Sequence, residues 1–370
     1  MNIGIDARLI GEKITGISRF LINVLKYIPN NDLINKYFLF SYQKPTFDNN
    51  FYSLNIVKKH RLPRQIEEHF WLNFSLPKIL SDQNIEIFFT PYILVPYKKG
   101  KFKNVIVIHD VMTKACSQFF TKHYINYMSV IVPQAIKKSD AIITVSKSAK
   151  NDIIRYYDVP SDKITIMHLW TDNKYKPITL NKEEVDRLNR KYNLPEKFLL
   201  FVGAIEERKN ILGILKISDI LNAKGTKHKI VLIGAQGFGF DKLNNEIMKR
   251  TDRVIYLKYV EENDLPLIYN LAKIFIFPSF YEGFGLPALE AMKCGLPILA
   301  ARNSSLIEVV GEGGLLFNAE DYVSFAESII MLLNDEQFYT EMRLRAIKQS
   351  EKFEPGKEII KLIILFNSLN

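Results

Sequence analysis

The sequence predicts an α/β protein of two domains, each built on a parallel sheet with helices on both faces. Its length of 370 residues favours two domains, at roughly 150 residues for each. Short apolar strands alternate with amphipathic helical segments through both halves of the chain, a pattern typical of parallel βαβ units. Hydrophobic residues make up 47% of the chain and charged residues 24%, so the composition excludes disordered, collagen-like and low-complexity proteins.

Residues 1–171 are expected to form the N-terminal domain. Apolar residues recur at helical spacing between Ile17 and Ile28, which predicts a helix near the start of this domain. Ser146 is expected to cap a second helix, because it directly follows an apolar run. Runs of β-branched and other apolar residues predict buried strands at 3–5, 104–108 and 141–145.

Residues 172–195 are polar and charged and contain Pro177 and Pro195, so this segment is expected to be a linker region. A second strand–helix series then fills residues 196–354, the expected C-terminal domain. Its strands are expected at 198–202, 230–233, 254–257, 274–277 and 297–300. Ligands of such folds bind at the carboxyl ends of the strands. The functional residues are therefore expected just after these strands.

The net charge of +10 is confined to the first half of the chain. Residues 1–170 hold 23 Lys and Arg against 13 Asp and Glu, whereas the remaining residues hold 27 of each. The bases are densest within residues 58–103, where aromatic residues are interleaved with them. This stretch is either a solvated surface that reflects a Lys-, Asn- and Ile-rich composition or a surface for anionic lipid headgroups or an anionic acceptor.

A strand end followed by a Gly-x-Gly turn predicts a phosphate site in the second half. Gly283 and Gly285 follow the strand at 274–277 and let the backbone approach a ligand closely. Pro287 marks the start of the next helix and Gly295 its end. The free N–H groups and the positive dipole end at the start of that helix suit a phosphate.

Charged residues accompany this turn. Glu282 precedes the helix and Glu290 lies inside it, so their carboxylates are expected to reach the hydroxyl groups of a ligand. Arg208 and Lys209 follow the buried strand at 198–202, at the same edge of the same sheet. Two cations at a helix start oppose the helix dipole, and a bound anion would relieve that conflict.

Taken together, these residues resemble a glycosyltransferase of the GT-B fold, in the large retaining family numbered four. The matching segments of the second half are 203–210, the loop and helix that carry Glu282 and Glu290, 303–311 and 314–317. Those of the first half are 4–8, the glycine loop at Gly16, the strand end at His109 and 144–146. The resemblance implies two Rossmann-like domains that face each other across a deep cleft. It also implies that the last helix, residues 355–370, crosses back to the N-terminal, acceptor-binding domain.

The resemblance assigns roles to matching positions. Arg208 and Lys209 would bind the diphosphate of a nucleotide-sugar and stabilise the leaving group, while Glu282 and His109 would lie at the donor sugar. These four are the catalytic candidates. Glu290 would hold the ribose. The other substrate-binding candidates are Gly16, Gly283, Phe284, Gly285 and Leu286.

The resemblance also implies a mechanism. The sequence has no Asp-x-Asp motif, so Arg208, Lys209 and a helix N-terminus would take the place of a metal ion, and no metal or other cofactor is expected. The family retains the anomeric configuration, and the departing phosphate takes the acceptor proton, which makes Glu282 a positioning and electrostatic residue. Two positions depart from the family pattern: Ile307, where Pro is common, and Lys258, where Gly is common near the nucleotide base.

Residues 4–8 and 304–310 are similar to mannosyl- and rhamnosyl-type enzymes of surface-polysaccharide synthesis. The expected reaction moves a hexose, with mannose from GDP-mannose preferred, to a lipid-linked or polysaccharide acceptor. The first residues do not read as a secretory signal, and the apolar runs are far shorter than the ~20 residues of a spanning helix. The protein is therefore expected in the cytoplasm, with peripheral contact to an anionic membrane through residues 58–103.

Two other functions stay open on the sequence alone. Residues 283–288 read as Gly-x-Gly-x-x-Ala, which is a fingerprint of dinucleotide binding. An NAD site needs an acidic residue at the end of the next strand, but that strand ends at Ala301-Arg302. An arginine there is compatible only with NADP, so the alternative is an NADP-dependent oxidoreductase. The basic first half also suggests a nonenzymatic nucleic-acid-binding protein. The neutral second half argues against that function, and no nucleic acid is expected as a partner.

Overall fold

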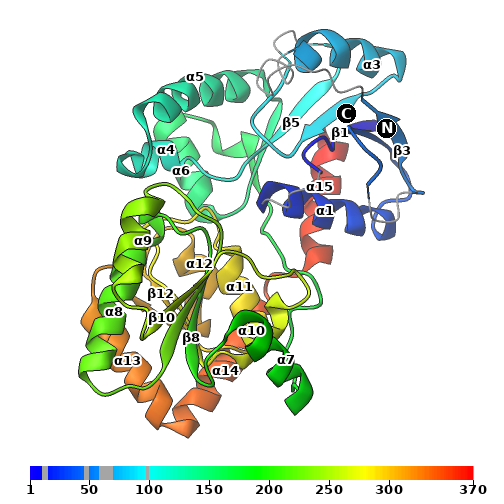
Figure 1. Cartoon of the computed structure of the whole chain (residues 1–370). Helices are drawn as coiled ribbons and strands as arrows, with labels where there is room; N and C mark the ends of the chain where they lie inside the picture. The colour runs from blue at the N-terminus through cyan, green and yellow to red at the C-terminus, as the bar shows by residue number, and fades with distance from the viewer. Residues whose placement is uncertain (11–15, 46–49, 58–69, 97–99, 370) are drawn as a thin grey trace. The chain divides into compact units, whose positions relative to one another are not determined.

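The computed structural model of the chain describes residues 1–370 except 11–15, 46–49, 58–69, 97–99 and 370. The chain forms two compact units (Figure 1). Unit 1 comprises Met1–Ala115, Thr121–Leu169 and Glu354–Asn370, and unit 2 comprises Cys116–Phe120 and Trp170–Phe353. Most of the bases of the predicted basic surface, at 58–69 and 97–99, lie outside the described residues.

Unit 1 contains a parallel sheet of seven strands in the order β3-β2-β1-β4-β5-β6-β7. The three strands predicted in this half are confirmed as β1, β5 and β6. The strands are β1 (Asn2–Asp6), β2 (Lys36–Ser41), β3 (Ser53–Ile56), β4 (Ile87–Thr90), β5 (Lys103–Ile108), β6 (Ala141–Thr144) and β7 (Ile164–Ile166). β1 lies between β2 and β4, so the strand order reverses there, and ligands of open α/β sheets bind at such a reversal.

Helices cover the sheet of unit 1. The helices are α1 (Gly16–Tyr27), α3 (Leu76–Asp82), α4 (Met112–Ala115), α5 (Lys122–Lys138), α6 (Lys147–Tyr157) and α15 (Pro355–Ser368). Of these, α1, α6 and α15 were predicted from the sequence, whereas α3, α4 and α5 were not. Ser146 caps α6 as predicted, because its Oγ accepts a hydrogen bond from the N–H of Ala149 at 3.0 Å. α5 and α6 pack with β5, β6 and β7 around one apolar cluster.

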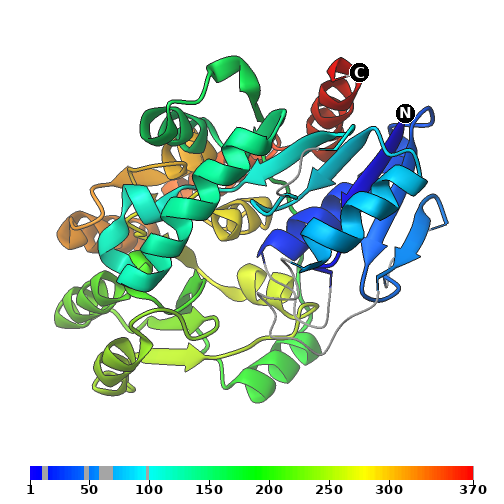
Figure 2. The ribbon, with the colours of Figure 1, turned by 90° about the horizontal axis from the view of Figure 1, so that it is seen from above.

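The last helix, α15, returns to unit 1 as predicted. Its Phe366 packs edge-on against Phe89 of β4, with ring centroids 5.7 Å apart. At its first turn, Glu358 accepts a hydrogen bond from the N–H of His168 at 2.8 Å and pairs with Lys361 at 2.7 Å. Figure 2 shows this red helix beside the blue N-terminal strands. The two ends of the chain therefore belong to one folding unit.

Unit 2 contains a parallel sheet of six strands in the order β10-β9-β8-β11-β12-β13. The five strands predicted here are confirmed as β8 to β12. The strands are β8 (Phe198–Val202), β9 (Lys229–Ile233), β10 (Val254–Leu257), β11 (Ile274–Phe277), β12 (Ile298–Ala301) and β13 (Leu315–Phe317). The strand order reverses at β8, so the residues that follow β8 and β11 meet at one edge of the sheet.

Helices cover both faces of this second sheet, with α8, α9 and α13 on one face and α10, α11 and α14 on the other (Figure 1). They are α8 (Ile211–Ala223), α9 (Phe240–Met248), α10 (Leu265–Leu271), α11 (Leu286–Lys293), α12 (Leu306–Val310), α13 (Tyr322–Asn334) and α14 (Glu336–Ser350). Stacked aromatic rings run through the core, with Phe277 of β11 5.8 Å from Phe201 of the neighbouring β8 and 5.5 Å from Phe275 of its own strand.

The segment 172–195, expected to be a linker, lies within unit 2 and holds the helix α7 (Lys182–Tyr192). Asn181 and Glu184 form a capping box at its start. The carboxylate of Asp264, in the loop before α10, accepts hydrogen bonds from Arg187, Lys191 and Tyr192 at 2.9, 2.9 and 2.7 Å. A polar sequence with little to bury therefore forms a helix because hydrogen bonds and ion pairs anchor it.

Candidate active site

The turn after β8 carries the two predicted cations. Arg208 and Lys209 lie in a short helical turn, Glu207–Lys209, that joins β8 to α8. Their side chains are 10% and 9% exposed, although arginine and lysine are rarely buried unless they are paired. Glu206 pairs with Arg208, with Oε1 2.5 Å from Nη2. Glu206 was not among the site residues predicted from the sequence.

Glu282, which follows β11, lies directly against both cations. Its Oε1 is 2.6 Å from Nζ of Lys209, and its Oε2 is 3.6 Å from Nη1 of Arg208. Burial by itself would raise the pKa of Glu282, but the charges of Lys209 and Arg208 hold the pKa below its ordinary value. Three of the four predicted catalytic residues therefore meet in one buried, charged cluster at the carboxyl edge of the sheet.

Backbone contacts hold the loop that carries Glu282. Nη1 of Arg208 donates to the carbonyl of Tyr281 at 2.5 Å. On the other side of the loop, Ser304 Oγ accepts from the N–H of Glu282 and Ser305 Oγ donates to its carbonyl, both at 2.9 Å. Asn303 Nδ2 donates to the carbonyl of Ser279 at 2.8 Å. The segment 303–305, which the sequence analysis matched without a role, clamps this loop.

The Gly-x-Gly turn and the helix after it are present, with the helix α11 starting at Leu286 instead of Pro287. Gly285 has φ +94°, a backbone conformation that favours glycine, and an added Cβ would lie 2.8 Å from Leu306 Cδ2 and displace that side chain. Phe284 is buried, and its ring packs edge-on against Phe353 with centroids 5.5 Å apart. The side chain of Phe284 therefore belongs to the core, and its backbone is the part available to a ligand together with Gly283.

Glu290 lies in α11 and is 2% exposed. Tyr269 of α10, itself fully buried, donates its hydroxyl hydrogen bond to Glu290 Oε2 at 3.0 Å. The ring of Tyr269 is in turn held edge-on by Tyr175, with centroids 5.9 Å apart. One oxygen of the predicted ribose-binding carboxylate is thus fixed by a neighbour that the sequence analysis did not identify.

Tyr269→Phe is expected to raise the KM for the donor by about tenfold or more and to change kcat little. The reason is that the carboxylate of Glu290 loses a hydrogen bond that orients it, and hydrogen bonds to charged groups contribute about 1.5–3 kcal/mol. The matched control is Tyr339→Phe, which removes a hydroxyl that donates to the Lys273 carbonyl at 3.0 Å. Steady-state kinetics separate the two variants. An unchanged donor KM in Tyr269→Phe, with only a lower melting temperature, would reduce Tyr269 to a structural role.

His109 and Gly16, the predicted site residues of the first half, belong to unit 1. Nε2 of His109 lies 3.1 Å from the carbonyl of Pro91, and its ring packs edge-on against Phe20 at 5.2 Å. Burial lowers the pKa of His109 to about 4, so at neutral pH the ring is uncharged and Nε2 carries the proton that it donates to Pro91. Gly16 is exposed at the start of α1, next to residues 11–15 outside the described part, and a Cβ there would meet no atom within 4 Å.

Within the described residues, no group of three or more His, Cys, Asp or Glu side chains is placed to hold a metal ion. Over the same residues, no helix is long and apolar enough to cross a membrane.

Comparison with known proteins decides the family. Residues 14–174 match the model of glycosyltransferase family 4, and residues 183–353 match that of glycosyl transferases group 1. The chain is 31% identical to O-antigen chain mannosyltransferase B of Escherichia coli over 278 residues, which cover 74% of this chain and 72% of that relative. The chain is a family 4 glycosyltransferase. This membership decides against the oxidoreductase and nucleic-acid-binding alternatives.

Other relatives agree on the family and the fold. This glycosyltransferase is 30% identical to the serotype-specific mannosyltransferase WbdA of Escherichia coli over 70% of its own chain, but it spans only 33% of WbdA. The structure of HepE of Anabaena in complex with UDP-glucose matches it with a TM-score of 0.75 at 16% identity, over the whole of both chains. The two parallel sheets with flanking helices therefore confirm the predicted GT-B class.

Proposed function

We propose that this glycosyltransferase moves mannose from GDP-mannose to a glycan or lipid-linked acceptor in the synthesis of a cell-surface polysaccharide, with retention and without a metal ion. The observation that carries the proposal is the buried cluster in which Glu282 contacts both Lys209 and Arg208. Two cations this well buried at the carboxyl edge of a parallel sheet are suited to the diphosphate of a nucleotide-sugar. The names of the relatives, O-antigen chain mannosyltransferase B and WbdA, support mannose as the sugar.

The donor would bind with its diphosphate at Arg208 and Lys209 and its ribose at Glu290. HepE, which shares the fold, was solved with UDP-glucose, and this supports a nucleotide-sugar as the donor. Glu282 and the backbone N–H groups of residues 283–285 would orient the hydroxyls of the sugar. Guanine as the donor base is the most specific part of the proposal. Lys258 stands near the expected position of the base, where the family often has glycine.

The proposed reaction is the retaining transfer that the resemblance to the family implies. The bond between the sugar's anomeric carbon and the phosphate oxygen breaks, and the acceptor oxygen forms its bond to that carbon on the same face. The acceptor proton passes to the departing phosphate oxygen. Arg208 and Lys209 stabilise the charge that grows on the leaving group, and such preorganised groups contribute about 10²- to 10³-fold each. Glu282 stays ionised, because its pKa lies below the ordinary value, and it acts by position and charge.

The thermal stability of the purified protein in EDTA, measured with GDP, UDP, ADP, NAD and NADP in turn, tests the proposal. A nucleotide present at 100 times its Kd stabilises the folded protein by about 2.7 kcal/mol. We expect GDP to raise the melting temperature of the wild-type protein. The Arg208→Ala and Glu290→Ala proteins should show no such rise. A rise in melting temperature with UDP or ADP instead of GDP would identify a different donor base. If no nucleoside diphosphate raised the melting temperature, the proposed donor site would be overturned.

We also propose that residues 58–103 bring the protein to an anionic membrane surface on the cytoplasmic side. In the described part of this segment, Phe70 and Phe74 stack at 5.1 Å and are 42% and 69% exposed, and Lys78 is exposed close by in sequence. Exposed aromatic rings beside basic residues suit the interface of an anionic bilayer. Sedimentation with phosphatidylglycerol vesicles tests this, and equal binding to neutral phosphatidylcholine vesicles would contradict it.

A further inference from the structure

A short segment from the first half of the chain belongs to unit 2. Residues Cys116–Phe120 are part of unit 2, although the chain on both sides of them, up to Ala115 and from Thr121, belongs to unit 1. The strands and α-helices of unit 2 all come from residues 170–353. The five-residue segment is therefore an addition to a unit that is otherwise built from continuous chain.

The segment contacts the rest of unit 2 through the ring of Phe119. Ser117–Phe119 forms one 3₁₀ turn. The ring of Phe119 stacks on that of Phe280, with centroids 5.5 Å apart and an angle of 15° between the planes. Aromatic pairs at this separation attract each other beyond the effect of burial alone. Both side chains are half-buried, so the stack lies at the edge of the apolar core and not inside it.

Phe280 lies next to the charged cluster of the candidate active site. It belongs to the loop after β11 that carries Glu282, and its N–H donates to the carbonyl of Arg208 at 2.9 Å. Arg208 in turn donates from Nη1 to the carbonyl of Tyr281. These two bonds fix the loop against the turn that carries both cations. A ring that holds Phe280 therefore acts on the relative position of Arg208 and Glu282.

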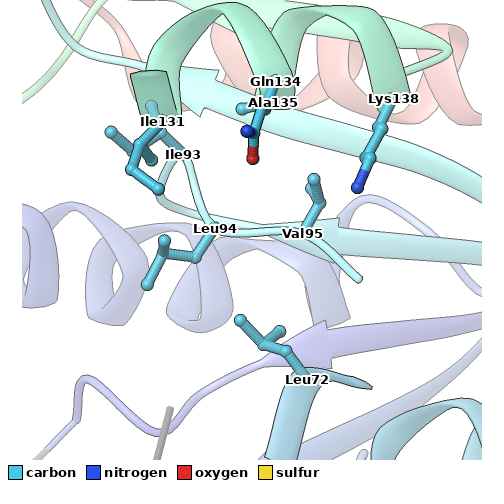
Figure 3. Close-up of a pocket in the computed structure, with 8 residues that line it drawn as sticks. All are labelled: Leu72, Ile93, Leu94, Val95, Ile131, Gln134, Ala135 and Lys138. Carbon is cyan, nitrogen blue, oxygen red and sulfur yellow. The ribbon is translucent and has the colours of Figure 1, made fainter. Parts of the chain in front are cut away.

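The segment is anchored in unit 1 at both ends. It follows α4 and leads directly into α5, whose cap is Thr121: the Oγ1 of Thr121 accepts from the N–H of Tyr124 at 3.2 Å. α5 packs into the apolar cluster of unit 1, and a cavity between this helix and residues 93–95 has a volume of about 20 Å³ (Figure 3). That volume suits about one water molecule. Five residues between two helices have little slack, so α4 and α5 constrain the position of Phe119.

We propose that Phe119 is a positioning residue for the transfer reaction. Its ring holds Phe280, and Phe280 holds the backbone of Arg208, so that Arg208 and Glu282 keep the positions that the leaving group and the donor sugar require. This inference rests on the proposed function, since it concerns the same reaction. A misplacement of about 1 Å at the reacting groups costs up to about 10²-fold in rate, so a contact outside the charged cluster has a large effect on kcat.

Phe119→Ala tests this role with GDP-mannose as the donor. Turnover is followed as release of GDP, which counts transfer to water as well and so needs no identified acceptor. We expect kcat to fall about tenfold or more, with little change in the donor KM. The rise in melting temperature with GDP should persist, because Arg208, Lys209 and Glu290 are all still present. If UDP or ADP gives that rise in wild type instead, UDP-glucose or ADP-glucose replaces GDP-mannose.

Two conservative variants separate stacking from bulk. Phe119→Tyr keeps the ring and should keep most of kcat. Phe119→Leu keeps apolar bulk without a ring and should lose kcat nearly as far as Phe119→Ala. The melting temperature without nucleotide should change little in all three variants, because the strands and α-helices of unit 2 come from residues 170–353.

A double variant identifies the partner of Phe119. Phe280→Ala should lower kcat by about the same factor as Phe119→Ala, and the double variant should be no slower than either, because residues in contact do not act independently. Phe51→Ala is the matched control. Phe51 is a half-buried ring of unit 1 that packs against Tyr37 and Tyr52, with centroids 5.9 and 5.2 Å away, and its loss should leave kcat unchanged.

Three results would overturn the proposal. The first is a wild-type kcat in Phe119→Ala, and the second is a double variant whose loss is the product of the two single losses. The third is a lower kcat accompanied by a lower melting temperature and a lost GDP effect, which would make Phe119 a structural residue. Absence of any nucleoside diphosphate effect in wild type would instead overturn the proposed function, so the two failures are distinguishable. If Phe119→Ala does not fold, the comparison of Phe119→Tyr with Phe119→Leu decides.

Discussion

Lys209→Met is expected to reduce kcat/KM by about 10²- to 10³-fold, the range observed when one group that stabilises a transition-state charge is removed. Lys209 is the cation closest to Glu282, at 2.6 Å, and both side chains are less than 10% exposed. Methionine keeps most of the length of the lysine side chain but carries no charge, so the leaving diphosphate would lose one of the two cations that we propose bind it. Release of the nucleoside diphosphate, followed at several donor concentrations, measures the loss.

The same substitution is expected to destabilise the protein by about 3 kcal/mol. Removing one partner of a buried ion pair costs about 3–5 kcal/mol, since the other charge is left without compensation. The expected loss of stability lies at the lower end of this range, because Arg208 still compensates part of the charge of Glu282. Its Nη1 lies 3.6 Å from Glu282 Oε2. Chemical denaturation measures the change.

Two comparisons separate the charge from the fold. The double variant Lys209→Met/Glu282→Gln removes both charges, so it should recover much of the lost stability and none of the lost activity. Lys242→Met removes a cation that is 69% exposed and 3.3 Å from Glu207; exposed pairs contribute about 0–1 kcal/mol, so little change is expected. Wild-type activity in Lys209→Met at an unchanged donor KM would contradict the role of Lys209 at the diphosphate.

The strands and the helix caps could be predicted from the sequence because they depend on local patterns. The apolar runs at 104–108 and 198–202, for example, became β5 and β8, since continuous burial on both faces leaves a local signature. The helix α7 was missed for the opposite reason. Only Leu188 of that helix is buried, and the contacts that hold it come from Asp264, more than 70 residues away.

The residues of the site could be predicted from the sequence, but the contacts between them could not. Lys209 and Glu282 were both named, yet they are separated by 73 residues, and their contact follows from β8 pairing with β11. That pairing is a non-local choice that one sequence does not specify. Tyr269 was missed, and Ser304 was matched without a role, because what they do is donate a hydrogen bond to Glu290 and accept one from the backbone of Glu282. Hydroxyl residues are frequent throughout the chain, and nothing in their sequence context marked these two contacts.

Gly234→Ala has the second large expected effect, a destabilisation of about 2–6 kcal/mol. Gly234 follows β9 with φ +153°, and a Cβ there would lie 1.9 Å from the carbonyl oxygen of Gly203, which follows β8. Backbone strain at such a φ costs about 1–3 kcal/mol, and overpacking a tight site costs a further 1–3 kcal/mol. Since the obstructing atom belongs to the backbone, no side chain can turn away to relieve the clash.

The effect of Gly234→Ala should also reach the active site. Gly203 donates its N–H to the carbonyl of Ile233 at 2.9 Å, so separating the two glycines moves the turn that leads to Arg208. A smaller nucleoside diphosphate shift should therefore accompany the lower denaturation midpoint. Gly225→Ala is the matched control, because Gly225 has φ +77° with no atom within 4 Å of an added Cβ, which leaves only strain of about 1–2 kcal/mol. Equal midpoints for the two variants would mean that the close approach of the two strand ends contributes nothing, and that backbone strain alone explains both glycines.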